Sequence, residues 1–222
     1  MSRRGILLPL LGCLLLSLGC AAAHAPPKKD YSAFRAADPR SILVVPVVNN
    51  TNNVEAPSLF LSTLSIPVGE RGYYVFPVNM VKRVLEDEGL SDADLVHMAD
   101  PRRLCNLFGA DAVLYVSIEA WTAQYLILDT SVTVEFDYVM KDGKTGDTIW
   151  KEHRRVVNSS AGQSRGSGNP FVDLVAMAVV AAVAKAAPDY MPLARQANNG
   201  VIHTLPPGPH STRYRTDELS PK

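Results

Sequence analysis

The feature that most constrains the fold is an alternation of apolar and polar residues between positions 112 and 157. A period of two residues places the apolar side chains on one face of a β-strand. The clearest alternating series is Val132, Val134, Phe136, Tyr138 and Met140, interleaved with Thr133, Glu135 and Asp137. Residues 141–147 have turn-forming composition, and residues 148–157 return as the next strand. With a strand over residues 112–121, the pattern predicts a three-stranded antiparallel meander that has one face in water.

The segment before the meander predicts both strands and helices. Ser41–Val48 is an apolar run of strand length. Its two apolar faces favour a central strand, whereas Pro46 argues against one because proline cannot donate a ladder hydrogen bond. Another strand is predicted over residues 72–77. Helices are predicted over residues 56–65, 78–89 and 101–108. The last two are each bounded by a glycine, the residue that commonly ends a helix.

The segment after the meander completes the predicted domain. A Gly/Ser-rich loop over residues 159–168, an alanine- and valine-rich helix over residues 169–187 and a short helix over residues 192–197 follow in order. We predict an α/β (α+β) domain over residues 41–200, with a mixed sheet whose one face is covered by helices. Residues 201–222 combine four prolines with mixed charges and predict a disordered tail.

The amino terminus has the features of a signal peptide over residues 1–19. Arg3 and Arg4 precede an uncharged run, Ile6–Leu18. As a helix this run would extend about 20 Å, which is too short for a hydrocarbon core of about 30 Å. Small residues follow, as expected near a cleavage site.

Two kinds of processing compete at this site. Leu16–Cys20 resembles the lipobox of bacterial lipoproteins, which predicts that Cys20 is acylated and carries the chain on a membrane. Ala23–Ala25 instead offers an ordinary signal peptidase site. Leu10–Cys13 fits the lipobox pattern better than the residues before Cys20, but lipidation at Cys13 would leave an h-region of only about seven residues, so Cys20 is preferred. Lipidation leaves Cys105 as a buried free thiol; an unmodified Cys20 would allow a disulfide between Cys20 and Cys105.

The residues around Cys20 also suggest where the protein resides. In lipoproteins of two-membrane bacteria the residue after the cysteine influences sorting, and here it is Ala21 rather than the aspartate linked to inner-membrane retention. The resemblance therefore implies the outer membrane, with the domain facing the periplasm. Residues 20–40 contain three prolines and no periodic apolar pattern, and they predict a flexible tether.

Several segments resemble a known family. They are Leu61–Leu64, Glu70–Val78, Phe108–Val116 and Thr145–Trp150. They resemble the bacterial lipoproteins typified by a meningococcal vaccine-candidate antigen, over about residues 41–200. The resemblance implies a fold similar to the amino-terminal domain of TolB and to CsgG-type periplasmic domains. Members of this family tend to be encoded beside a CsgG-like lipoprotein and a small third lipoprotein. The resemblance therefore also implies a complex of these proteins in the cell envelope.

Catalytic chemistry finds little support in the sequence. Cys105 and His97 would lie about 12 Å apart on one helix, beyond hydrogen-bond reach, and Pro101 lies between them. No two histidines have the spacing of a zinc site, so neither a metal nor a cofactor is expected. The printed chain is neutral, and removing Arg3 and Arg4 leaves 20 basic against 22 acidic residues, which argues against nucleic acid as a partner.

Three functional hypotheses follow. The first is a non-enzymatic, lipid-anchored subunit that docks on other envelope proteins, with a homo-oligomer as one form of assembly. The second is a module that binds glycan or peptidoglycan fragments through Tyr73, Tyr74, Trp121 and Trp150. The third is an enzyme, which the lack of a nucleophile–base pair disfavours. Glu70 and Arg71 offer either a surface ion pair or part of a docking edge, and the surface ion pair is the preferred interpretation.

Overall fold

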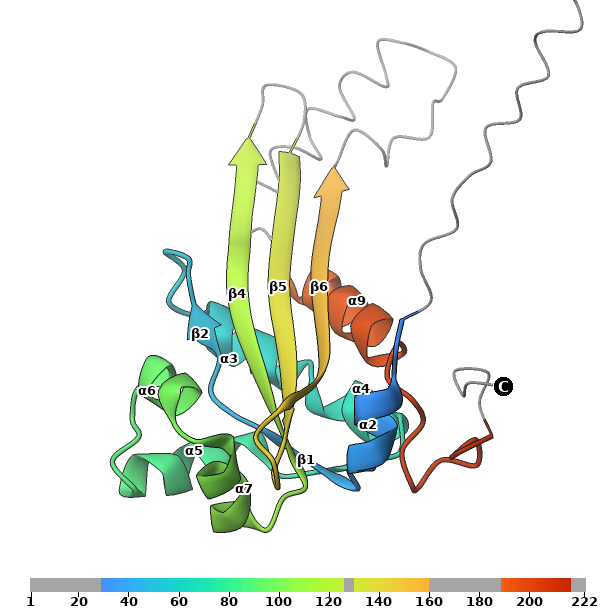
Figure 1. Ribbon diagram of the computed structural model, residues 1–222. Helices are drawn as coiled ribbons and strands as arrows, with labels where there is room; N and C mark the ends of the chain where they lie inside the picture. Colours follow the sequence, from blue (N-terminus) through green and yellow to red (C-terminus); the bar gives the residue numbers. More distant parts are fainter. Residues whose placement is uncertain (1–28, 126–129, 160–188, 217–222) are drawn as a thin grey trace, which may run out of the picture. The chain divides into compact units, whose positions relative to one another are not determined.

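A six-stranded mixed sheet forms the framework of the protein (Figure 1). The structure is a computed structural model that describes residues 29–125, 130–159 and 189–216. The chain divides into two compact units, Met1–Asp30 and Tyr31–Lys222, and every described helix and strand belongs to the second.

The described elements alternate between helices and strands before the meander. In chain order they are α2 (Ser32–Ala37), β1 (Ser41–Val44), β2 (Val48–Asn49), α3 (Ala56–Ser62), α4 (Ser65–Glu70), β3 (Tyr74–Val75), α5 (Val78–Asp87), α6 (Ala93–Met98), α7 (Pro101–Phe108), β4 (Ala112–Tyr125), β5 (Thr130–Asp142), β6 (Thr148–Ser159) and α9 (Met191–Ile202). The predicted helices over residues 56–65, 78–89 and 101–108 are therefore confirmed as α3, α5 and α7. Three short helices, α2, α4 and α6, had no prediction.

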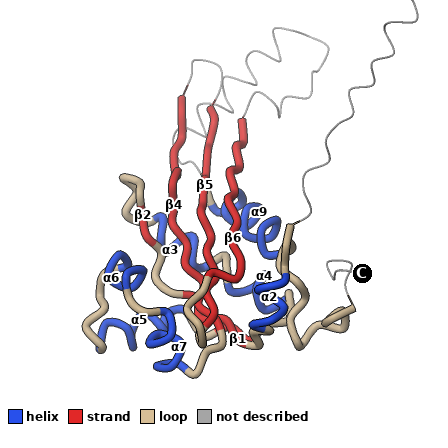
Figure 2. Tube along the Cα trace, in the orientation of Figure 1, coloured by secondary structure: helices blue, strands red, loops and turns tan. Residues whose placement is uncertain are grey.

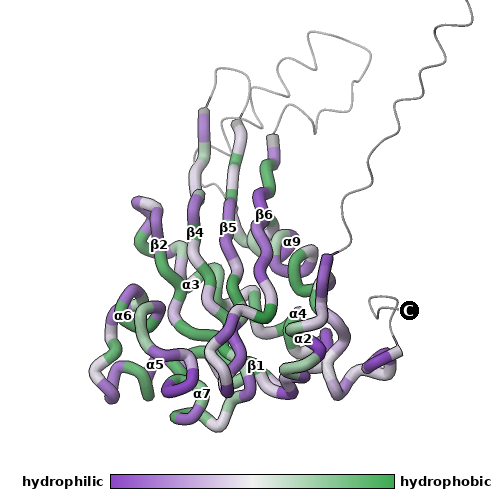
Figure 3. Tube along the Cα trace, in the orientation of Figure 1, coloured by the Kyte–Doolittle hydropathy of each residue, from purple (hydrophilic) through white to green (hydrophobic). Residues whose placement is uncertain are grey.

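The strands are ordered β3-β1-β4-β5-β6 across the sheet. β4, β5 and β6 lie side by side in Figure 2. β1 runs parallel to both β3 and β4, whereas β4, β5 and β6 are antiparallel neighbours. The predicted meander and the mixed α/β fold class are thus confirmed. Polar and apolar residues alternate along the meander, as Figure 3 shows.

Pro46 divides the predicted central strand into two pieces. β1 pairs with β4 through Val44, and β2 resumes the pairing with the same strand at Ser117 and Ile118. Proline has no N–H to contribute to the ladder, so the chain leaves the sheet around it. Both arguments from the sequence hold: the run is central and buried, and it is interrupted at the proline.

Helices cover both faces of the sheet around β1, which corrects the prediction that they cover one face. On one face, Ile42, Leu114 and Phe136 pack with α3, α9 and the aromatic ring of Phe60. On the other, Leu43 and Val113 pack with α5, α6 and α7. Consecutive residues of a strand point to opposite faces, so an apolar run without alternation needs cover on both.

The predicted tether is wrong for residues 31–40. Residues 32–37 form α2, and Phe34 and Tyr31 are buried in the main core. The sequence did not predict this helix, because the segment has only two large apolar side chains, Tyr31 and Phe34, and two are too few to show a helical period.

The predicted disordered tail is wrong for residues 201–216. α9 runs to Ile202, well beyond the predicted short helix, and Val201, Ile202 and Leu205 are buried. The prolines at 206 and 207 mark a bend in ordered chain rather than the loss of structure. The predicted loop over residues 159–168 and helix over residues 169–187 lie outside the described residues, apart from Ser159 in β6.

A buried polar network docks α9 on the meander. The Tyr138 hydroxyl donates to Asn198 Oδ1 at 2.7 Å, and Asn198 Nδ2 donates to Thr63 Oγ1 at 2.7 Å. All three side chains are buried. Because a satisfied buried network allows few alternative arrangements, it fixes the register of α9 against β5 and α3.

Candidate functional site

The carboxy-terminal segment Thr204–Arg215, here called the strap, crosses the start of the domain and closes over it. Tyr31 donates its hydroxyl hydrogen to the Thr204 carbonyl at 2.6 Å, and the Tyr73 hydroxyl donates to the Pro206 carbonyl at 2.6 Å. The backbone N–H groups of Gly208 and His210 donate to the carbonyls of Arg71 and Gly72. The strap thereby joins the two ends of the described domain.

Close approach of the strap requires a glycine at position 72. Gly72 has φ +96°, and a Cβ there would lie 2.7 Å from the backbone nitrogen of Ser211. Only glycine tolerates both the conformation and the contact. The strap that packs against Gly72 and Tyr73 therefore fixes the conformation of this segment.

Arg71 is buried beneath the strap, which corrects its placement at the surface by the interpretation from the sequence. Its side chain is 9% exposed, and both Nε and a terminal guanidinium nitrogen donate to the carbonyl of Leu205. A buried guanidinium bonded to a carbonyl holds the end of α9 against α4.

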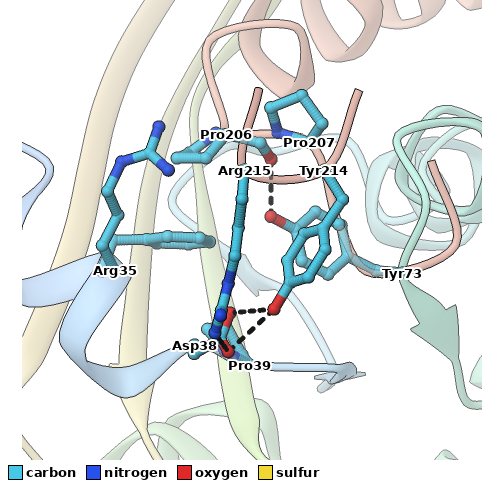
Figure 4. A pocket seen from close by; sticks show the side chains of 10 residues that line it. Arg35, Asp38, Pro39, Tyr73, Pro206, Pro207, Tyr214 and Arg215 are labelled. Carbon is cyan, nitrogen blue, oxygen red and sulfur yellow. Dashed lines mark hydrogen bonds and ion pairs between the residues drawn. The ribbon is translucent and has the colours of Figure 1, made fainter. Parts of the chain in front are cut away.

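Asp38 forms the polar centre of the pocket under the strap (Figure 4). The Tyr214 hydroxyl donates to both carboxylate oxygens at 2.7 and 2.8 Å, and Arg215 forms an ion pair with the same carboxylate. Burial alone would raise the pKa of Asp38, but the hydrogen bonds from Tyr214 and Arg215 outweigh it and lower the pKa. The carboxylate is therefore ionised at neutral pH.

Both partners of that ion pair have unusual backbone conformations. Asp38 has φ 43° and Arg215 has φ 58°, the two positive-φ residues other than glycine in the described chain. Non-glycine residues in this region store about 1 kcal/mol or more of strain, which the surrounding contacts must offset. The contacts of this ion pair therefore hold the strap in a strained backbone conformation.

The contact of Asp38 with Tyr214 and Arg215 is here called the clasp. The pocket that it lines has a volume of about 270 Å³. It is lined by Phe34, Arg35, Asp38, Pro39, Tyr73, Pro206, Pro207, Gly208, Tyr214 and Arg215. Its polar groups are mostly engaged with one another, and it contains no thiol, histidine or serine that could act as a nucleophile. Its geometry is suited to holding two chain segments together rather than to catalysis.

The four aromatic residues singled out from the sequence do not share a surface. Tyr73, Trp121 and Trp150 are buried in the main core. Tyr74 is 53% exposed. The glycan-binding hypothesis required all four side chains to be exposed. Strand alternation and packing of the strap instead determine which of them are exposed to solvent.

Tyr74 instead belongs to an apolar surface at one edge of the sheet, here called the β3-edge patch. Its ring meets Phe76 edge-on at 5.0 Å, and Phe76 meets Phe108 of α7 at 6.1 Å. Leu107, beside Phe108, is exposed. β3 pairs with β1 on one side and has no described strand on the other, so an open strand edge adjoins the exposed ring of Tyr74.

Cys105 and His97 occupy separate environments. Cys105 is 1% exposed among Leu104, Val113 and their neighbours, and burial raises the pKa of its thiol to about 12. His97 Nε2 lies 3.0 Å from the Pro46 carbonyl, and burial lowers the pKa of the imidazole. A thiol that is protonated at neutral pH is a poor nucleophile.

The described residues hold no group of three histidine, cysteine or acidic side chains arranged to bind a metal. Within the same residues, no helix has both the length and the apolar character needed to cross a bilayer. Cys20 lies outside the described part of the chain.

Sequence reasoning missed Asp38, Tyr214 and Arg215. These residues lie in segments without apolar periodicity, 176 and 177 positions apart in the chain, so no local pattern relates them. The Pro206-Pro207-Gly208 series was the available signal, because such a series restricts the chain to a defined turn.

The fold of this protein is similar to that in a crystal structure of lipoprotein GNA1162 from Neisseria meningitidis. The two share 32% sequence identity and a TM-score of 0.53, over 66% of this chain and 99% of that one. The class of protein is therefore the α/β domain of a bacterial lipoprotein.

The family follows from the sequence comparisons. The model of the family described as "Putative lipoprotein GNA1162-like" matches residues 29–208. A lipoprotein of Neisseria meningitidis serogroup B (strain ATCC BAA-335 / MC58), named NMB1124/NMB1162, is 33% identical over 169 residues, 76% of this chain and 75% of its own length. The chain belongs to the GNA1162-like lipoprotein family, as the resemblance of its motifs predicted.

A more distant solved structure, a PelC dodecamer from Paraburkholderia phytofirmans, shares 14% identity and a TM-score of 0.42 over 72% of this chain and 86% of that one. At this level of similarity the match carries no functional information.

Proposed function

We propose that this protein is a lipid-anchored, non-enzymatic subunit of a lipoprotein complex at the outer membrane, facing the periplasm. Membership of a lipoprotein family supports the anchor in general, and the lipobox-like segment supports Cys20 as the acylated residue. Two or three acyl chains at about 0.8 kcal/mol per buried methylene make dissociation from the membrane negligible.

The anchor would keep the domain close to the bilayer. Since residues 31–40 belong to the domain, only residues 21–30 remain between Cys20 and the folded unit. Ten residues reach at most about 36 Å even when fully extended. Partners of the domain would therefore be proteins that are themselves at the membrane surface.

The observation that carries a docking role is the β3-edge patch. Exposed Tyr74 and Leu107 lie beside half-buried Phe76 and Phe108. Aromatic side chains next to an open strand edge are typical of protein interfaces, because they bury a large area at low cost in side-chain entropy. The partner that the family resemblance suggests is a CsgG-like lipoprotein.

A photo-crosslinking experiment in cells tests this role. A photoreactive phenylalanine analogue replaces Tyr74 in one variant and Val157 in a control, since the two side chains are 53% and 52% exposed. We expect a single discrete adduct with another envelope lipoprotein from position 74 and none from position 157. Equal labelling from both positions, or none from position 74, would contradict docking through this patch.

The anchor is tested separately. We expect Cys20→Ser to move the protein from the membrane fraction to the soluble fraction, and mass spectrometry of the mature chain to find acyl groups on Cys20.

Counting reactive thiols gives a second test of the anchor. Native protein should show no thiol that reacts at pH 8, because Cys105 is buried. Denatured protein should show one thiol, that of Cys105; two thiols would contradict acylation of Cys20, and the acyl groups found by mass spectrometry distinguish acylation from cleavage after Ala25.

The glycan-binding hypothesis loses its original basis because three of its four aromatic residues are buried. A pull-down with purified cell-wall sacculi keeps it testable. Retention of wild-type protein that Tyr74→Ser abolishes would favour glycan binding over protein docking at the β3-edge patch.

A further inference from the structure

The two long edges of the meander differ in charge. β6 forms one edge, and five consecutive ionisable residues, Lys151–Arg155, lie along it. The upper part of β4 forms the other edge, and residues 120–125 carry no charge. Charged residues on an edge strand prevent pairing with another chain, whereas an uncharged edge favours it.

The edge of β4 becomes free at a defined point. β2 pairs with β4 only at Ser117 and Ile118, and the last backbone bond on this side runs from the Asn50 N–H to the Ile118 carbonyl at 3.0 Å. No described strand pairs with this side of β4 beyond Ile118. In an antiparallel pair, every second residue directs its N–H and C=O away from the partner, so this edge presents a row of hydrogen-bonding groups.

A β-bulge lies at the same point. The register of β4 against β5 shifts between Ile118 and Ala120, which leaves Glu119 without a directly opposed residue. Bulges turn a strand and redirect its side chains, and they are frequent beside functional sites. Here the bulge places exposed Glu119 at the beginning of the free edge, where Asn50 Nδ2 donates to its carboxylate at 2.9 Å.

A groove of about 490 Å³ follows this edge. Its lining residues are Asn50, Thr51, Asn52, Asn53, Glu119, Trp121, Thr122, Ala123 and Tyr190. The loop that carries the three asparagines forms one wall and β4 forms the other. The space is sufficient for a few residues of extended chain, and Glu119 is the one charged side chain of the lining.

The wall formed by β4 contains an unsatisfied donor. Trp121 is 3% exposed and stacks on Tyr190 with ring centres 5.0 Å apart. Its indole Nε1 is buried and has no hydrogen-bond partner within the described chain. A buried donor without an acceptor costs about 1–3 kcal/mol, so the described chain leaves this wall of the groove incompletely satisfied.

We propose that this groove binds an extended peptide segment of a partner protein, which adds as a strand to the free edge of β4 and carries a lysine or arginine beside Glu119. The backbone edge supplies affinity, as in other cases of strand addition. Glu119 supplies the preference for positive charge. The site is separate from the β3-edge patch and does not depend on the lipid anchor.

Two synthetic eight-residue peptides test the proposal on the full chain in detergent. Both alternate threonine and valine; one carries lysine at each end and the other carries glutamate. We expect the lysine peptide to bind at least about fivefold more tightly than the glutamate peptide. Hydrogen–deuterium exchange should slow at residues 120–125 when the lysine peptide is added, and should not change at residues 151–157.

Matched substitutions locate the site. Thr122→Lys puts a charge on the free edge, whereas Thr133→Lys puts the same charge on the opposite residue of β5, one strand inward. Both side chains lie on the outward face of the sheet and neither is buried, so we expect both variants to remain folded. Thr122→Lys should weaken binding of the lysine peptide at least about tenfold and Thr133→Lys less than about twofold. Glu119→Gln should remove the preference for lysine over glutamate.

Other results would overturn the proposal. Exchange at residues 120–125 that no peptide alters, or equal loss of binding in the two lysine variants, would exclude strand addition at this edge. A dimer seen by analytical ultracentrifugation that Thr122→Lys dissociates would assign the edge to a second copy of the chain. Protection by muropeptide sugars but not by peptides would assign the groove to glycan.

Discussion

The two halves of β4 show how cover by helices divides this domain. From Ala112 to Val116 every side chain is buried, because α7 and its neighbours cover one face and the main core covers the other. From Ser117 onward only the inward side chains, such as Ile118 and Trp121, are buried. One strand is therefore interior at its start and amphipathic at its end, and the groove and the free edge occur only in the second half.

The largest expected effect comes from placing the same charge on the same face of both halves. Val113 is fully buried against α5–α7, so Val113→Lys should lower the free energy of unfolding by more than about 5 kcal/mol or prevent folding. Thr122→Lys, nine residues along on the same face, should change it by less than about 0.5 kcal/mol. Urea denaturation followed by circular dichroism measures both. Similar losses in the two variants would show that the second half is covered as well.

The second prediction concerns the inward face of the meander. Phe136 is fully buried and contacts Phe60 with ring centres 4.6 Å apart. Phe136→Ala should lower the free energy of unfolding by about 4 kcal/mol, because a large cavity replaces the ring. The neighbouring control Thr133→Ala, on the outward face, should cost less than about 0.5 kcal/mol. A loss below about 1 kcal/mol for Phe136→Ala would mean that the inward face is loosely packed.

The third prediction tests the network that holds α9 to the inward face. Asn198→Ala leaves the Tyr138 hydroxyl buried without an acceptor and should cost about 2 kcal/mol. Asn198→Leu combined with Tyr138→Phe removes both polar partners and should restore much of that loss. If the double variant is as unstable as the single one, packing volume rather than hydrogen bonding determines the stability here.

The smallest expected effect belongs to the outward face. His153 is bonded to Asp137 at 2.7 Å and lies 3.3 Å from Glu135, which also pairs with Arg155. The hydrogen bond to Asp137 raises the pKa of His153 against a smaller opposing effect of desolvation, and the charges of Asp137, Glu135 and Glu119 add to the rise. The folded protein therefore holds this proton more tightly than the unfolded chain does.

This contribution is fully present below about pH 6.5 and is lost as the pH rises through the raised pKa. The stability difference between wild type and His153→Gln should shrink from pH 6 to pH 8, and by less than about 0.5 kcal/mol because the side chain is exposed. Denaturation at the two pH values measures it. A difference that grows with pH would contradict the assignment.

The sequence predicted most of the sheet because strand signals are local. The alternation from Val132 to Met140 and the turn at residues 141–147 specify a hairpin without reference to the rest of the chain. The same holds for α7, where Asp100 caps the first turn and Gly109 ends the helix with φ 68°. Each signal is satisfied within about ten residues, so a sequence pattern can contain it.

The candidate sites were beyond such patterns. The clasp unites Asp38 with Tyr214 and Arg215, and the groove unites Asn50 with Glu119 and Tyr190. None of these residues has a neighbour in the sequence that reveals its partner. The burial of Tyr73 and Trp121 likewise depends on segments more than 60 residues away.

By itself the sequence determined the mixed fold, the meander and the family, because period, turn chemistry and motifs act over short distances and need no distant contact. Only the tertiary structure decided that helices cover both faces at the start of β4, that residues 31–40 and 201–216 belong to the domain, and which edge remains free. Those outcomes depend on which distant segments meet. Packing of residues far apart in the chain sets them, and no local pattern encodes it.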